Sequence, residues 1–79
     1  MKSAVCRKIK EYRIRKGVTQ ETVAQAVYCS QQSIARYEKD QVPDLDTLIR
    51  LADFFHVSLD ELAGRKYPVT DTLEEVTIL

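Results

Sequence analysis

Signals for helix starts and helix ends recur at short intervals along this chain, and they limit the length of every helix. Glycine marks two helix ends, and Ser, Thr or Asp precedes four stretches with helical spacing of apolar residues; these residues are Gly17, Gly64, Thr19, Ser30, Asp44 and Ser58. The expected helices cover residues 3–16, 20–27, 31–39, 45–55 and 59–63. Helices this short do not persist alone in water, so each must be held by its neighbours. The sequence therefore predicts an all-α fold, a compact five-helix bundle with a short C-terminal extension.

The apolar residues of these stretches predict the core. A chain of 79 residues buries only about 60–65% of its surface on folding, so the core must be small. We expect its central side chains to be Ile9, Val23, Ile34, Leu48, Ala52 and Leu62. Helical spacing also turns Leu45, Ile49 and Leu59 inward.

The composition argues against several classes of protein. No apolar run approaches the 18 residues of a membrane span, and charge appears too early for a signal peptide, so we expect a cytoplasmic protein that contacts no membrane. Two cysteines, Cys6 and Cys29, and one histidine cannot supply the ligands of a zinc site, so we expect no metal and no cofactor. His56 stands without paired cysteines, a metalloprotease motif or a Gly-rich phosphate loop. We therefore predict that the protein is not an enzyme.

The net charge is zero, with 12 basic and 12 acidic residues, but the charges are unevenly distributed. Residues 1–16 hold seven Lys or Arg and one Glu, whereas residues 40–63 hold one Arg and six acidic residues. One end of the molecule can therefore face a polyanion such as nucleic acid. A solvated basic helix face would give the same pattern, so the charges alone do not decide the function.

Residues 20–39 predict a helix, a tight turn and a second helix, which together form a helix-turn-helix. With its apolar residues turned inward, the second helix exposes Gln31, Gln32, Ser33, Ala35 and Arg36. Here the chain resembles the lambdoid-repressor/Cro type, or XRE family, of helix-turn-helix DNA-binding domains in bacterial and phage transcriptional regulators. The resemblance covers residues 7–63 and is carried by Ile9 to Arg13, Lys16 to Glu21, Val23, Ala24, Ser30 to Glu38, Pro43 to Leu48 and Val57 to Leu62.

The resemblance implies a repressor that reads double-stranded DNA by inserting helix 31–39 into the major groove. The family's base-reading positions match Gln31, Gln32 and Arg36, and paired hydrogen bonds join Gln to adenine and Arg to guanine. The resemblance implies contacts with the DNA backbone for Gln20, Arg13, Ser33, Lys39 and Lys10. Arg13 also matches a position that pairs with the Glu ending the reading helix, here Glu38, and one guanidinium could serve both roles.

Two positions depart from the family pattern. Tyr28 stands where the family usually has Gly, at the left-handed position of the turn, where a side chain costs about 1–2 kcal/mol unless the turn is reshaped. The loop of residues 39–43 is one residue shorter than usual, with Asp40 in place of a common Gly and no second basic residue. This shortening weakens the expectation that the loop contacts the DNA backbone.

The chain divides into an expected DNA-binding domain at residues 1–64 and a tail at residues 65–79. Residues 73–79 have the spacing of one further helical face, while residues 76–79 suit an edge strand equally well, and a disordered end is a third alternative. One reading helix covers too few base pairs to mark a site in a genome, so we expect a homodimer on a pseudo-palindromic operator. The expected dimer contacts are Leu62, Val76, Ile78 and Leu79.

The main alternative is a regulator that acts chiefly through a protein partner, such as an antitoxin or a control protein of a phage or other mobile element. Its contact surfaces would be the acidic stretch of residues 40–61 and the tail. A chain that bound only a protein partner would show no affinity for duplex DNA at low salt.

Overall fold

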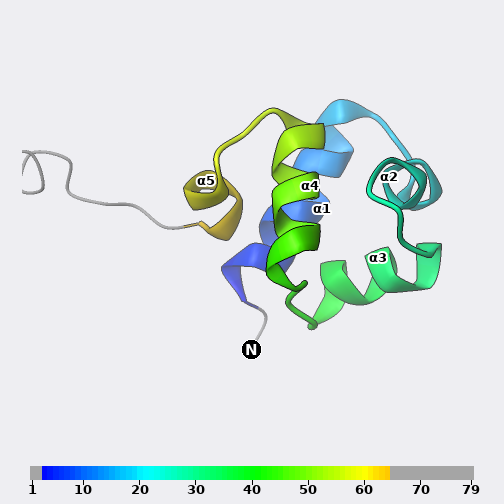
Figure 1. Ribbon diagram of the computed structural model, residues 1–79, viewed down its shortest axis with the longest axis horizontal. Coiled ribbons are helices and arrows are strands. Elements are labelled where there is room, and N and C mark those ends of the chain that lie inside the picture. The colour runs from blue at the N-terminus through cyan, green and yellow to red at the C-terminus, as the bar shows by residue number, and fades with distance from the viewer. Residues whose placement is uncertain (1–2, 65–79) are drawn as a thin grey trace, which may run out of the picture.

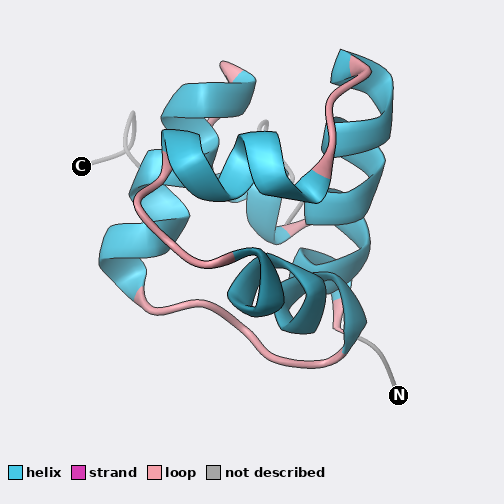
Figure 2. Cartoon of the chain, turned by 90° about the vertical axis from the view of Figure 1, so that its right-hand side faces the viewer, coloured by secondary structure: helices cyan, strands magenta, loops and turns pink. Residues whose placement is uncertain are grey.

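The computed structural model describes residues 3–64, which form helices joined by short loops, with no strand in this range (Figures 1 and 2). The helices are α1 (Ala4–Lys16), α2 (Gln20–Ala26), α3 (Gln31–Lys39), α4 (Leu45–Phe55) and α5 (Leu59–Ala63). The predicted all-α bundle is therefore confirmed, and each helix boundary lies within one residue of its expected place.

A side chain caps the start of every helix in the described range. Each capping oxygen accepts a hydrogen bond from the backbone N–H three residues later, as Thr19 does from Thr22 and Ser30 from Ser33. The other capping residues are Ser3, Asp44 and Ser58. These bonds satisfy N–H groups that have no partner within the helix, and they explain why short helices begin where they do.

Two helices end with a residue other than Gly in the left-handed conformation. Tyr28 follows α2 with φ at 61°, and His56 follows α4 with φ at 58°. In both cases the next residue closes the helix with a backbone hydrogen bond, from Cys29 N–H to the Ala24 carbonyl (2.8 Å) after α2. This is the geometry that usually selects Gly, so Tyr28 keeps the family's turn instead of reshaping it.

The core contains Leu51 where the sequence led us to expect Leu48. Its buried residues are Ile9, Val23, Ala24, Val27, Ile34, Leu51, Ala52, Phe55 and Leu62, which include every other expected member. Leu48 is only partly buried, and the inward placement expected for Leu45, Ile49 and Leu59 is wrong, since these side chains are 63%, 41% and 41% exposed. The α4 sequence carries two overlapping apolar stripes, and packing buries the one that contains Leu51 and Phe55.

The helices are arranged so that α3 lies at one edge of the molecule (Figure 1). It packs against α2 and α1, while α5 packs against α1 and α4 on the other side. Gly64 ends α5 so close to the start of α1 that a Cβ atom there would lie 2.7 Å from the Ala4 Cβ. Helices α1 and α2 therefore hold α3 in place, and α5 is held against α1 at the other side. No helix among residues 3–64 is both long and apolar enough to cross a membrane.

Candidate nucleic-acid interface

Helix α3 separates buried residues on one side from polar, exposed residues on the other. Ile34 is fully buried and Glu38 is 4% exposed, and both face the interior. Four residues expected to meet DNA are exposed on this helix, namely Gln31, Gln32, Arg36 and Lys39. Ser33 is half-buried, and its hydroxyl lies 3.0 Å from that of Ser30. The structure thus presents the expected reading residues on the surface of one helix.

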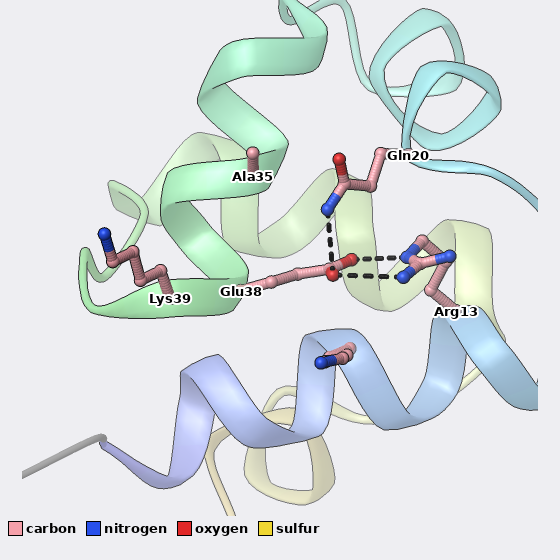
Figure 3. A pocket seen from close by; sticks show the side chains of 6 residues that line it. Arg13, Gln20, Ala35, Glu38 and Lys39 are labelled. Carbon is pink, nitrogen blue, oxygen red and sulfur yellow. Dashed lines mark hydrogen bonds and ion pairs between the residues drawn. The ribbon is translucent and has the colours of Figure 1, made fainter.

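An ion pair joins α1 to the end of α3, as expected for Arg13 and Glu38. The Arg13 guanidinium donates from Nε (2.5 Å) and Nη2 (3.2 Å) to the two carboxylate oxygens of Glu38 (Figure 3). Its Nη1 donates to the backbone carbonyl of Val18 at 3.0 Å. The Arg13 side chain is only 17% exposed. Most of its donors therefore serve the protein itself, which favours the structural role over a contact with DNA.

Gln20 connects this ion pair to the first residue of α3. Its Nε2 donates to Glu38 Oε1 at 3.2 Å, and its Oε1 accepts from Gln31 Nε2 at 3.2 Å. Figure 3 shows Gln20 and Arg13 reaching the Glu38 carboxylate from different helices. This connection was not predictable from the sequence, because it depends on how α2 crosses α3.

A shallow hollow opens where α1, α2 and α3 meet, lined by Lys10, Arg13, Gln20, Ala35, Glu38 and Lys39. Lys10 and Lys39 are exposed, and the negative charge of Glu38 is compensated by Arg13. The small Ala35 side chain keeps the hollow open. Its two exposed lysines bring positive charge to the hollow, and positive charge is what a phosphate group requires.

Other basic residues of α1 are paired within the protein. Arg15 Nη2 lies 2.9 Å from Glu11 Oε1, and Lys8 Nζ lies 3.8 Å from the same oxygen. Lys16 lies over the ring of Phe54, 5.0 Å from its centre. The basic charge counted in the sequence of residues 1–16 is therefore only partly available to a nucleic acid.

Of the residues expected to form a dimer contact, one is buried and the other three lie outside the described residues. Leu62 is fully buried in the core of its own chain, so its expected role in a dimer contact is wrong. Val76, Ile78 and Leu79 lie outside the described residues. Within residues 3–64, no group of three or more His, Cys, Asp or Glu residues could hold a metal ion.

Comparison with known proteins identifies the family. The family model for the helix-turn-helix matches residues 9–62, which is more than half of the chain. The chain belongs to the helix-turn-helix family. The match includes α2, α3, α4, most of α1 and all but the last residue of α5, so this helix-turn-helix domain contains all residues of the hollow.

Two regulators are similar in sequence to this helix-turn-helix chain. It is 35% identical over 60 residues to the HTH-type transcriptional regulator ImmR of Bacillus subtilis (strain 168), covering 75% of this chain and 47% of ImmR. It is 31% identical over 64 residues to the HTH-type transcriptional activator BcrR of Enterococcus faecalis, covering 80% of this chain and 31% of BcrR. The chain thus spans about half of the one relative and a third of the other.

Solved structures show the same helix-turn-helix fold. The P22 c2 repressor, crystallised in complex with synthetic operator 9T in the presence of Tl⁺, matches with a TM-score of 0.74 at 21% identity, over 78% of this chain and 96% of the repressor chain. A transcriptional regulator from Listeria innocua matches with a TM-score of 0.76 at 22% identity, over all of this chain and 80% of the regulator. The expected lambdoid-repressor fold is therefore confirmed.

Proposed function

We propose that this protein is a transcriptional repressor that binds a specific sequence of double-stranded DNA through residues 1–64. The observation that carries this proposal is the exposed polar surface of α3, where Gln31, Gln32 and Arg36 stand on a helix whose other side is fixed in the core. A single α-helix fits the major groove of B-DNA. The relatives named as a transcriptional regulator and a transcriptional activator support a role in transcription, and the repressor solved with its operator supports the repressor role.

Gln31, Gln32 and Arg36 are assigned to the bases. An amide can bond both N6 and N7 of adenine, and a guanidinium can bond both O6 and N7 of guanine. Each such pair discriminates against a wrong base by about 1–3 kcal/mol. The three side chains are exposed, so they can meet base edges without unfolding any part of the helix.

Lys10 and Lys39, which both line the hollow, are assigned to the DNA backbone. Gln20 and Ser33 are assigned weaker backbone contacts, because their polar atoms already bond other side chains. We assign Arg13 mainly to the support of Glu38. Phosphate contacts position the protein on the duplex and carry no sequence information of their own.

We further propose that the protein binds as a homodimer to an operator with two half-sites. Two reading helices one DNA turn apart, ~34 Å, would then read both halves of a pseudo-palindrome. Val76, Ile78 and Leu79 remain the proposed contacts in the tail. Leu59 replaces Leu62 in this proposal, since it lies on the same helix and is 41% exposed.

Selection of bound duplexes from a random-sequence pool tests the proposed function. We expect the selected duplexes to share an inverted repeat with a fixed separation between its halves. Selection of duplexes with only a single half-site would contradict the homodimer. It would not contradict the proposal that α3 reads the bases. Absence of any binding to duplex DNA at low salt would contradict the proposal as a whole, and a regulator that acts through a protein partner would then replace it.

A further inference from the structure

The outward side of α1 carries a second hollow, which is largely apolar. It is lined by Arg7, Lys10, Glu11, Ile14 and Arg15, and all of these residues belong to α1. Within residues 3–64, no side chain of another helix lines it. Ile14 is 58% exposed there, next to three basic side chains. This hollow therefore offers both apolar surface and positive charge to a group that covers it.

Lys10 connects this side of α1 with the binding of DNA. It lines the hollow on α1 and also the hollow between α1, α2 and α3 that is assigned to a phosphate. Lys10 forms no ion pair with any of residues 3–64. An acidic group that binds Lys10 from the α1 side therefore competes with the DNA backbone for the same charge.

Helix α5 ends beside the start of this side of α1. A Cβ atom at Gly64 would lie 2.7 Å from the Cβ atom of Ala4. Ala4 begins a row of residues at three- and four-residue intervals that leads along the helix to Ile14. This row is about 15 Å long, at 1.5 Å per residue. The chain from Gly64 to Leu73 can span up to about 30 Å, so it is long enough to reach the hollow.

Residues 71–79 have the composition that suits the hollow on α1. They contain three acidic residues and no basic one, whereas the lining contains three basic residues and one acidic residue. Four of them are large and apolar, namely Leu73, Val76, Ile78 and Leu79. A phosphate backbone would use only the cations, so the exposed Ile14 favours a polypeptide. Because the segment belongs to the same chain, its effective concentration at α1 is about millimolar, and a weak contact is sufficient to hold it.

We propose that residues 71–79 bind the outward side of α1 in the DNA-free protein and compete with the DNA backbone for Lys10. The segment thereby lowers the affinity for DNA, and a phosphate at Lys10 displaces it. This inference rests on the proposed function, because the competition requires that Lys10 binds DNA. The displaced residues include Val76, Ile78 and Leu79, so binding to DNA frees the side chains that are proposed to form the dimer contact.

The backbone amide signals of the full chain, recorded by NMR without DNA, test where the segment binds. Replacing Glu74 and Glu75 together by Lys should shift the signals of residues 7–15 and leave the signals of α4 unchanged. If the signals of residues 7–15 did not move, the proposal would be overturned. Shifts that appear only when the protein concentration is raised would also overturn it, because the segment would then bind a second copy of the chain.

Binding of the full chain to random duplex DNA tests the competition. Ile14→Ser removes apolar surface from the hollow and changes no charge, so it should tighten binding roughly threefold. Leu45→Ser is the matched control, because Leu45 is 63% exposed on α4 and should keep the wild-type affinity. Leu73→Ser should tighten binding to the same extent as Ile14→Ser. The two changes together should add nothing further, because each removes the same contact.

The outcomes separate this inference from the proposed function. Wild-type affinity for DNA in Ile14→Ser or in Leu73→Ser would overturn the competition and leave the proposed function in place. Additive effects of the two changes would overturn the contact between the segment and the hollow. A wild-type chain that binds no duplex DNA at low salt would instead contradict the proposed function. The NMR signals would then still show whether the segment binds α1.

Discussion

Tyr28 shows that one residue can depart from the family pattern while the backbone keeps its path. It holds a left-handed conformation that Gly adopts without strain, and the Arg50 guanidinium lies over its exposed ring, 5.6 Å from the ring centre.

The free energy of unfolding of Tyr28→Gly should be about 1 kcal/mol higher than that of Tyr28→Ala. Both variants lose the ring, but only Ala keeps the strain of the left-handed conformation. Urea denaturation of both variants measures this, and equal stability would contradict a strained turn.

Asp44 gives stability a dependence on pH. Hydrogen bonds from the Thr47 side chain and backbone N–H, at the start of α4, hold the pKa of the Asp44 carboxyl below its ordinary value. Around the folded and unfolded pKa values of Asp44, the folded protein therefore binds fewer protons than the unfolded chain. The contribution of Asp44 to the stability of the folded protein is lost as the pH falls through the folded pKa. Asn also caps helices but does not titrate.

Comparison of Asp44→Asn with the wild type checks this expectation. The difference in Tm between the two proteins should be largest near about pH 6, above the usual pKa of Asp, and should shrink toward about pH 3. A difference that stays constant over this range would show that the charge of Asp44 does not contribute.

The exposure of the residues proposed to read bases was predictable residue by residue, whereas the hydrogen bonds of Gln20 were not. Gln31, Gln32 and Arg36 follow from helical spacing once Ile34 is placed in the core. The two bonds of Gln20 depend on the separation and crossing of α2 and α3, which residue types alone do not encode. Tyr28 was predictable as a left-handed residue from its match to a Gly position, but His56, with the same conformation, carried no such signal.

At the scale of elements, α3 depends on one fully buried side chain for its position. Ile34 packs in the core with residues of the other helices. Replacing it by Ala removes buried apolar surface and leaves a cavity, so Ile34→Ala should lower the free energy of unfolding by about 2–4 kcal/mol. Chemical denaturation monitored by circular dichroism measures this. A loss below about 1 kcal/mol would contradict the tight packing of α3.

The ion pair between Arg13 and Glu38 fastens α1 to the last turn of α3. Removing Glu38 alone should destabilise the protein more than removing both residues, because the largely buried Arg13 is then left without its partner. A double-mutant cycle with Arg13→Ala and Glu38→Ala should give a coupling energy of about 1–3 kcal/mol. Additive effects would mean that the pair contributes nothing to holding the two helices together.

The boundaries of the helices were more predictable than the direction in which α4 faces. Capping residues and glycines determine where each helix begins and ends, and these signals are local. The choice between the two apolar stripes of α4 depends on its neighbours. Leu51 reaches the centre of the core there, so Leu45 and Ile49 turn to the outside.

At the scale of the whole molecule, the fold brings sequence-distant residues to one face. Lys10 on α1, Gln20 on α2 and Lys39 on α3 line the same hollow, and α3 also carries the residues proposed to read bases. The uneven charge along the sequence predicted a basic region, yet part of that charge is paired with Glu11. We propose that two parts of this face have separate roles, in which α3 reads the bases and the lysines bind the phosphates.

Binding of Gln32→Ala to the selected operator and to random DNA tests whether the roles of α3 and of the lysines are separate. We expect about 1–3 kcal/mol weaker binding to the operator, a relaxed preference at one position and nearly unchanged binding to random DNA. As the matched variant, Lys10→Ala should weaken binding to both duplexes alike and reduce the salt slope by about one. If Gln32→Ala weakened both duplexes equally, α3 would not be the helix that reads the bases.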